Sequence, residues 1–285
     1  MERVEIFEVG PRDGLQNEAR LIPLAEKVAL VDCLSQAGFR RIECASFVSP
    51  KWVPQMADSA DVLAGITRDD GVSYAALTPN MRGFEAAMVA QADEVAIFGS
   101  ASEGFSKANI NASIAESLER FKPVAEAAQA RGVPVRGYVS CVVECPYDGA
   151  IAPDAVARVV AALRDMGCYE VSLGDTIGRA TPEGITAMLR AVMDEMPANR
   201  LAGHYHDTSG RACDNVEASL EMGLRVFDAA VGGLGGCPYA PGAAGNVATE
   251  AVAARVETLG YGHGLDMTVV TQAAAMARAM REERV

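Results

Sequence analysis

The sequence predicts a (β/α)8 barrel, an α/β fold, with extra helices after the last barrel unit. Three observations favour it: strand-like and helical segments alternate, one short module recurs, and the chain has a suitable length. Alternating strands and helices are typical of βα units, which build a parallel sheet. Eight such units over about 260 residues match the size of a closed barrel. We therefore interpret residues 1–285 as a single domain.

The eight expected strands are short runs of apolar and β-branched residues, and segments of helix length separate them. They cover residues 4–9, 41–46, 72–77, 94–98, 135–140, 170–173, 201–205 and 226–231.

Two of the intervening segments have apolar residues at clear helical spacing. Gly38 is expected to end the first helix, and the second is expected between Asp154 as N-cap and Gly167 as its stop. The C-terminal end of the chain is also helical in pattern, and we expect it to cover one side of the barrel or to join a partner subunit. The apolar residues are Leu24, Val28, Val31 and Leu34 in the first helix, and Val156, Val159, Val160 and Leu163 in the second.

A weak internal repeat supports the barrel. The stretches AGFRRIECAS from 37, MGCYEVSLGD from 166 and MGLRVFDAAV from 222 share one pattern. Each has a glycine that ends a helix, a short polar link and an apolar strand. A doubly wound open sheet is the competing layout, and it usually shows a G-x-G-x-x-G loop after the first strand. The segment GPRDGLQ from 10 does not fit that loop, so the closed barrel is favoured.

Composition excludes several classes of protein. With 50% hydrophobic and 22% charged residues, the chain is too apolar for disorder. A net charge of −13 argues against binding of nucleic acid phosphates. The seven cysteines form no disulfide framework, which favours a reducing compartment. There is no run of about 18 apolar residues for a membrane span, and the first strand begins too early for a leader peptide. We therefore expect a cytoplasmic location.

Polar residues gather where the expected strands end, and active sites of (β/α)8 barrels lie at these C-terminal strand ends. We therefore expect these side chains to converge on one face. In chain order they are Arg12 and Asp13, Glu43 and Ser46, Tyr138 and Ser140, Ser172, Asp175 and Thr176, His204, His206 and Asp207, and then Cys237 and Asn246.

The histidine pair is the sharpest local signal. Two of only three histidines are His204 and His206, which share one side of a strand. Two buried histidines hydrogen-bonded within the core are the alternative to a metal site. For a metal site, Asp13 is the best third ligand, and two histidines with oxygen ligands suit a divalent ion such as Mg²⁺, Mn²⁺, Zn²⁺ or Fe²⁺. A thiolate zinc site is disfavoured because Cys141 and Cys145 have no second pair, so we interpret them as packing residues, or Cys145 as a loop residue.

The segment 232–246 is rich in glycine, as expected of a mobile loop or of a close backbone approach to a ligand. A long turn is the alternative. Cys237 lies in this segment, and its thiol is a candidate acid or base. Arg12 beside Asp13 is also compatible with a surface ion pair, while Glu43 is a candidate buried partner that holds Arg12 in place.

Taken together, these segments resemble the 3-hydroxy-3-methylglutaryl-CoA lyase family over nearly the whole chain. The arginine–aspartate pair, the H-x-H pair and the glycine–cysteine loop all occur at corresponding places. The matching segments are EVGPRDGLQNE from 8, SFVSPKWVPQM from 46, LTPNMRGFEAA from 77, KANINASIAES from 107, RGYVSCVVECPYDG from 136, MGCYEVSLGDTIG from 166, HYHDTSG from 204 and GGLGGCPYAPGAAGNVATE from 232.

The resemblance implies a homodimeric barrel that requires Mg²⁺ or Mn²⁺. It implies cleavage of 3-hydroxy-3-methylglutaryl-CoA to acetyl-CoA and acetoacetate, the closing step of leucine degradation. By the same match, Asp13, His204, His206 and Asn246 bind the metal, Arg12 and Cys237 are catalytic, and Glu43 and Asp175 act near the substrate. Asp175 or His204 is the candidate base. Expected substrate contacts are Arg12, Gln16, Phe47, Asn109, Tyr138, Ser140, Ser172 and Thr176, with Lys51 and Lys107 near the CoA phosphates.

Two features depart from the family or fall outside its site. Tyr205 stands between the two histidines where a smaller residue is expected, and it should point away from the metal. His263 lies beyond the last barrel unit and is expected to take no part in the site.

Three other functions remain open at this point. One is a related acyl-CoA lyase, and another is a Claisen-type synthase such as isopropylmalate or homocitrate synthase. The synthases usually carry an added C-terminal region, whereas this chain stops soon after the barrel. The third is a barrel that binds metal without catalysis.

Overall fold

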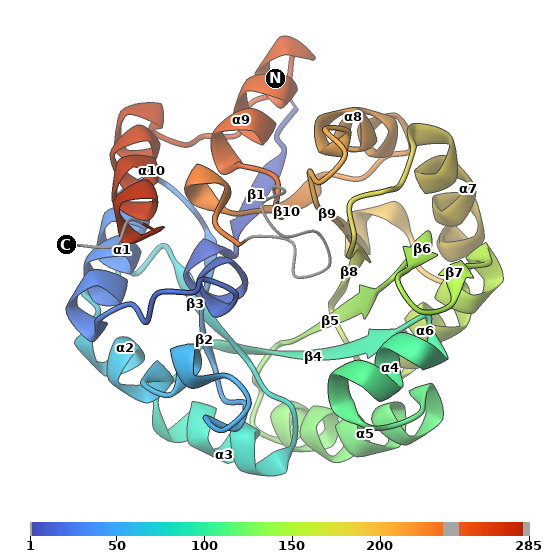
Figure 1. Cartoon of the computed structure of the whole chain (residues 1–285), viewed down its shortest axis with the longest axis horizontal. Helices are drawn as coiled ribbons and strands as arrows, with labels where there is room; N and C mark the ends of the chain where they lie inside the picture. Colours follow the sequence, from blue (N-terminus) through green and yellow to red (C-terminus); the bar gives the residue numbers. More distant parts are fainter. Residues whose placement is uncertain (1, 236–244, 282–285) are drawn as a thin grey trace.

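The computed structural model describes residues 2–235 and 245–281, and its centre is a closed barrel of eight parallel strands (Figure 1). Hydrogen bonds link the strands in the order β1-β10-β9-β8-β5-β4-β3-β2. This confirms the expected fold. The strands are β1 (Glu5–Glu8), β2 (Arg41–Ser46), β3 (Ser73–Leu77), β4 (Glu94–Ser100), β5 (Val135–Ser140), β8 (Glu170–Asp175), β9 (Leu201–Tyr205) and β10 (Val226–Ala229).

The helices form a ring outside the strands (Figure 1). They are α1 (Leu24–Ser35), α2 (Ser59–Gly65), α3 (Met81–Val89), α4 (Glu103–Ile110), α5 (Ile114–Ala130), α6 (Pro153–Asp165), α7 (Pro182–Met193), α8 (Ala212–Glu221), α9 (Thr249–Thr258) and α10 (Met267–Arg281). Short helical turns follow β1 (η1, Gly10–Gly14), β2 (η2, Pro54–Met56) and β10 (η4, Val231–Gly233), and η3 (Ala198–Arg200) precedes β9. A small hairpin of β6 (Glu144–Cys145) and β7 (Gly149–Ala150) follows β5.

All eight strands predicted from the sequence are present, and only their ends differ. Strands β4 and β8 are each longer than expected, reaching Ser100 and Asp175. Both extensions continue the ladder with β5 or β9, where Ser100 pairs with Ser140 and Asp175 with Tyr205. Because these strands end in polar residues, the apolar pattern alone does not predict where they end.

Gly38 and Gly167 end α1 and α6 as expected. Their φ angles of +90° and +88° lie in the region that side chains with a Cβ rarely adopt. The N-cap prediction for α6 is wrong, because the N-cap is Ala152 and Asp154 lies inside the first turn. Pro153 occupies the first helical position, where its fixed φ and missing N–H fit. Asp154 therefore contributes a negative charge at the positive end of the helix rather than a cap.

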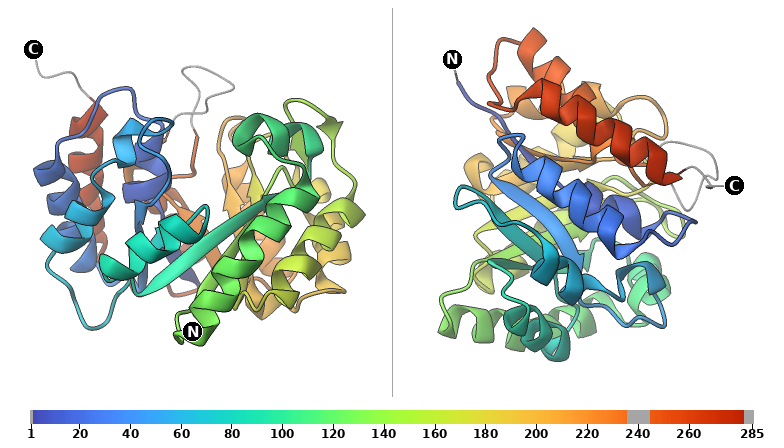
Figure 2. Two further views of the ribbon diagram at one scale, coloured as in Figure 1. Left: turned by 90° about the horizontal axis from the view of Figure 1, so that it is seen from below. Right: turned by 90° about the vertical axis from the view of Figure 1, so that its left-hand side faces the viewer.

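Helix α10 lies beside α1, so the end of the described chain completes the helical ring next to its beginning (Figure 2). This confirms that the C-terminal segment covers one side of the barrel. In the described ranges, no helix is long and apolar enough to span a membrane.

The two faces of the strands differ in chemistry. The outer face packs on the helices through a large apolar cluster that includes Ile42, Ile97 and Leu173. The barrel interior instead buries charged side chains, among them Arg136, Glu170 and Asp228. Branched apolar side chains usually fill such barrels. The buried charges in this barrel are therefore a distinctive feature of its interior.

Candidate metal and catalytic site

Three of the predicted metal ligands meet at the C-terminal end of the barrel. One ligand atom each from Asp13, His204 and His206 lies within 4.8 Å of the others. His204 is on β9 and His206 directly follows it, with their ring centroids 5.5 Å apart. His204 Nε2 lies 3.7 Å from Asp13 Oδ2. The spacing of two residues on a strand therefore places both imidazoles on the side that faces Asp13.

Asp13 reaches this position through the π-helical turn η1 directly after β1. The backbone N–H groups of Asp13 and Gly14 both donate to the carbonyl of Val9, which winds the chain tightly at the strand end. A Cβ on Gly14 would lie 2.6 Å from Cβ of Leu234. Only glycine permits that approach, so GPRDG packs directly on the segment after β10.

Asn246 completes the set predicted to bind metal. An isolated antiparallel bridge pairs its backbone with that of His206. Its side-chain Nδ2 donates to Asp13 Oδ2 over 2.8 Å. A flip of this amide would present its oxygen, the atom that a hard cation prefers.

The donor set fits a divalent cation. His206 Nδ1 is buried and has no hydrogen-bond partner among the described residues, which is costly for a polar atom unless something else binds the ring. Burial, reinforced by His204, lowers the pKa of His206 to about 4, so the ring is neutral at pH 7. Burial would raise the pKa of Asp13, but Arg12 together with the two histidines and Asn246 outweighs it and lowers the pKa to about 2. A carboxylate and a neutral imidazole are the forms that bind metal.

Arg12 is fixed beside this cluster by two carboxylates. Its Nε donates to Glu43 Oε2 over 2.6 Å and its NH1 to Asp13 Oδ1 over 2.7 Å. Arg12 is only 5% exposed, which rules out the alternative of a surface ion pair. Burial alone would lower the pKa of Arg12, but Glu43 and Asp13 raise it, so the guanidinium stays charged. The structure also supports the interpretation of Glu43 as the residue that holds Arg12.

The carboxylate of Asp175 is bonded to its own loop and not to the residues of this cluster. Its carboxylate accepts the backbone N–H groups of Ala180 (2.9 Å) and Arg179 (3.2 Å), both in the loop that follows β8. Burial raises the pKa of Asp175 to about 6, against the effect of those amides. Its predicted role near the substrate is therefore not supported by a contact with the histidines.

The predicted substrate contacts divide into three groups along the strand ends. Tyr138 and Ser172 are inside the barrel, where the ring centre of Tyr138 lies 5.7 Å from the guanidinium carbon of Arg12. Ser140 and Thr176 lie at the rim, and the Cys141 N–H donates to Thr176 Oγ1. The others are more peripheral: Gln16, Phe47 and Lys51 follow β1 and β2, and Lys107 and Asn109 are exposed on α4.

Cys237 lies outside the described residues. Cys141 and Cys145 are buried together with Phe105, as expected of packing residues. Tyr205 points outward as expected, since its hydroxyl bonds Ser219 Oγ on α8 over 2.7 Å. His263 bonds Glu257 over 2.9 Å and is remote from the cluster in sequence and contacts.

Two residues that the sequence did not single out belong to the site. Asp228 on β10 accepts a hydrogen bond from His204 Nδ1, with 3.1 Å between the atoms, and is paired with Arg136 on β5. Both sit in runs that were interpreted only as strands. The signal available was a charged residue inside each otherwise apolar run, VFDA and VRGY.

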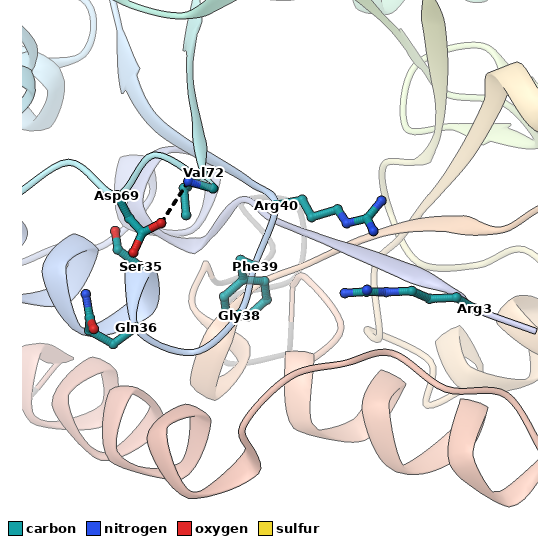
Figure 3. Close-up of a pocket in the computed structure, with 9 residues that line it drawn as sticks. Arg3, Ser35, Gln36, Gly38, Phe39, Arg40, Asp69 and Val72 are labelled. Carbon is teal, nitrogen blue, oxygen red and sulfur yellow. Dashed lines mark hydrogen bonds between the residues drawn. The ribbon is translucent and has the colours of Figure 1, made fainter. Parts of the chain in front are cut away.

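Cavities lie at both ends of the barrel. One of about 310 Å³ lies between Gln16 and Trp52, in the loops that follow β1 and β2. Another, of about 350 Å³, is lined by Arg3, Phe39, Arg40 and Val72, which precede β1, β2 and β3 (Figure 3). The second cavity is therefore at the N-terminal end of the barrel strands, opposite the end that holds Asp13, His204 and His206.

Comparison with known proteins agrees with this geometry. The family model described as HMGL-like matches residues 3–277. The chain belongs to the HMGL-like family.

Relatives of this HMGL-like chain include proteins named as lyases. It is 57% identical to the 3-hydroxy-3-isohexenylglutaryl-CoA/hydroxy-methylglutaryl-CoA lyase of Pseudomonas aeruginosa, over 95% of this chain and 91% of that protein. The structure of HMG-CoA lyase from Brucella melitensis is 61% identical, with a TM-score of 0.98 and 99% of both chains covered. An HMG-CoA lyase from Acinetobacter baumannii, in complex with coenzyme A and 3-methylmalate, is 36% identical with a TM-score of 0.93, covering 98% of this chain and 91% of that chain.

Proposed function

We propose that this chain is a divalent-metal-dependent lyase that cleaves 3-hydroxy-3-methylglutaryl-CoA to acetyl-CoA and acetoacetate. The observation that carries the proposal is the cluster of Asp13, His204 and His206 beside the buried Arg12, in a chain 61% identical to an HMG-CoA lyase. We further propose that residues 1–285 act as one catalytic domain, in the cytoplasm, as a homodimer, in leucine degradation.

Asp13, His204 and His206 would hold the cation, with Asn246 as a fourth ligand. Bound there, Mg²⁺ or Mn²⁺ would act as a Lewis acid on oxygen atoms of the substrate. Arg12 supplies a fixed positive charge where the thioester oxygen becomes negative as the carbon–carbon bond breaks. Glu43 and Asp13 keep that charge from reorienting, so it is already in place when the negative charge develops.

The base that takes the hydroxyl proton has two candidates, and each carries a difficulty. Asp175 has a pKa of about 6, suited to a base near neutral pH, but its oxygens face its own loop. The His204 nitrogen that faces Asp13 cannot hold a cation and a proton together. We keep both candidates, and we propose Cys237 as the acid that returns a proton to the enolate carbon.

The deciding experiment measures acetoacetate released from 3-hydroxy-3-methylglutaryl-CoA. The purified protein is stripped with EDTA and then assayed without metal and with Mg²⁺ or Mn²⁺. We expect no turnover after stripping and recovery with either ion. Full activity in EDTA would contradict the metal requirement, and no product under any condition would contradict the lyase and favour a barrel without catalysis.

A related substrate is the second candidate, because the Pseudomonas aeruginosa relative is named for two acyl-CoA substrates. Its second substrate differs in the group at carbon 3, where an isohexenyl chain replaces a methyl group. A kcat/KM for 3-hydroxy-3-isohexenylglutaryl-CoA above that for the methyl compound would favour this candidate. The three relatives named above are lyases, so a Claisen-type synthase has less support.

The role of Cys237 can be tested separately. Cys237→Ala should lose most of kcat and still bind acyl-CoA, because the thiol is proposed to move a proton rather than to hold the substrate. Turnover near that of the wild type would remove the thiol from the chemistry. Cys213→Ala, on α8, is the matched control.

A further inference from the structure

A buried carboxylate stands behind one of the two histidines. Asp228 on β10 is directly opposite His204 on β9 in the register of the parallel strands. The Asp228 side chain is fully buried, and its Oδ2 lies 3.1 Å from His204 Nδ1. On the other side of the ring, His204 Nε2 faces Asp13. The imidazole therefore lies between two carboxylates, with one ring nitrogen toward each.

The surroundings of Asp228 decide which atom carries the ring proton. Arg136 donates to both of its oxygens, over 2.7 Å and 3.0 Å, and Ser172 Oγ donates to Oδ2 over 2.7 Å. A carboxylate paired with a guanidinium only accepts hydrogen bonds. His204 must therefore donate from Nδ1, and Nε2 is the ring nitrogen that faces Asp13 and the cluster.

We propose that Asp228 is a positioning residue that fixes the tautomer and ring orientation of His204 for a cation. The inference rests on the proposed metal-dependent function and adds a residue that acts through a ligand. Carboxylates that accept the second N–H of a metal-bound histidine are a recurring device in metal sites. Arg136 and Ser172 in turn hold the carboxylate, so the support for His204 extends to β5 and β8.

The two histidines of the pair are unequal in this respect. The structure gives His204 a buried anionic partner, whereas His206 Nδ1 has none among the described residues. His204 is thus oriented before any ion binds. His206 has no comparable constraint on its tautomer from the described side chains.

The first test reads the ring protons directly, by long-range ¹H–¹⁵N NMR of the histidines in the full-length protein without metal and with Mg²⁺. We expect His204 to carry a proton on Nδ1 in both samples. His263 is an internal control with the opposite tautomer, since its Nδ1 accepts the N–H of Leu265. A His204 ring protonated only on Nε2 would overturn the proposal.

The second test measures cation affinity by calorimetry with Mn²⁺. In Asp228→Asn the amide can donate to Nδ1 and so favour the wrong tautomer, and we expect the Kd for Mn²⁺ to rise by about 10–100-fold. Tyr205→Phe, which changes a side chain that lies on the same strand as His204 but points to α8 and bonds Ser219, is the matched control, and its Kd should stay within about threefold of the wild type. A folded Asp228→Asn protein with a wild-type Kd would refute the positioning role.

The two tests distinguish a misfolded variant, a failure of the proposed metal-dependent function and a failure of the positioning role of Asp228. Thermal unfolding shows whether Asp228→Asn is folded, and if it is not, the NMR result on the wild-type protein decides. Wild-type protein that binds no Mn²⁺ would contradict the proposed metal-dependent function. The tautomer of His204 in the metal-free protein would still decide whether Asp228 orients the ring.

Discussion

The inner and outer faces of the same eight strands are stabilised in different ways. The outer face packs apolar side chains such as Ile97 and Leu173 against the helices, and this contact depends on burial and volume rather than on direction. The inner face holds Arg136 between Asp228 and Glu170, and each of these groups depends on its partner. Substitutions should therefore be tolerated on the outer face and not on the inner one, unless both partners change together.

The largest effect on stability is expected for Arg136→Met. It removes the shared partner of Asp228 and Glu170 and leaves two buried carboxylates without it. Breaking a buried ion pair in this way should lower the free energy of unfolding by about 3–5 kcal/mol. Urea unfolding of this variant beside Leu173→Met, a change that conserves volume on the outer face, measures the contrast. Equal losses in both proteins would contradict the difference between the faces.

Arg12→Met tests whether the charged inner face also performs chemistry. We expect kcat to fall by about 100–1000-fold because the proposed charge on the thioester oxygen loses its partner. KM should change much less. Steady-state kinetics with 3-hydroxy-3-methylglutaryl-CoA separates the two constants. A raised KM with unchanged kcat would instead make Arg12 a substrate anchor.

Glu8→Gln tests a carboxyl group on the outer face. Glu8 accepts the N–H groups of Gly10 and Val231 and bonds Thr249 Oγ1, and burial raises its pKa from 4.5 to about 7. Between pH 4.5 and 7, Glu8 is protonated in the native state but ionised in the unfolded chain. The contribution of Glu8 to stability therefore falls as the pH rises through this range. The full loss is about 3 kcal/mol at about 1.4 kcal/mol per pH unit.

Glutamine keeps the same shape without this titration. We therefore compare the free energy of unfolding of Glu8→Gln minus that of the wild type at two pH values. This difference should be more positive at pH 8 than at pH 5, by up to about 3 kcal/mol. Urea unfolding at the two pH values gives that difference. An identical difference at both would show that Glu8 titrates normally.

Tyr205→Phe should have the smallest effect, although Tyr205 lies between the two histidines. Its side chain points to α8, and the variant loses only the hydrogen bond to Ser219. We expect a loss of about 1 kcal/mol in stability and an unchanged Kd for Mn²⁺. A higher Kd for Mn²⁺ would mean that the outer face also influences the arrangement of Asp13, His204 and His206.

Much of the fold could be predicted from the sequence because its signals are local. A short apolar run indicates each strand, and the glycines that end α1 and α6 have a positive φ, which glycine adopts readily. His204 and His206 were found because strand alternation places them on one side. The N-cap of α6 was missed because a favoured cap residue lay one position inside a helix that begins with Pro153.

The support for the site was harder to predict. Asp228 and Arg136 are 92 residues apart and meet only across the closed barrel. In the sequence each is a single charged residue in an apolar strand, with nothing to indicate its partner. The direction of the Asp175 side chain also could not be inferred, because its carboxylate accepts the amides of its own loop.

The bond between Asn246 and Asp13 joins residues 233 positions apart. Asp13 comes from the first βα unit, His204 and His206 from the seventh barrel strand and the residue after it, and Asn246 from beyond the eighth barrel strand. During synthesis, the ribosome must therefore release nearly the whole polypeptide before these groups can assemble. A chain that stops before β9 contains Asp13 without His204, His206 and Asn246, so binding of the proposed cation by all four would require translation past the final barrel strand.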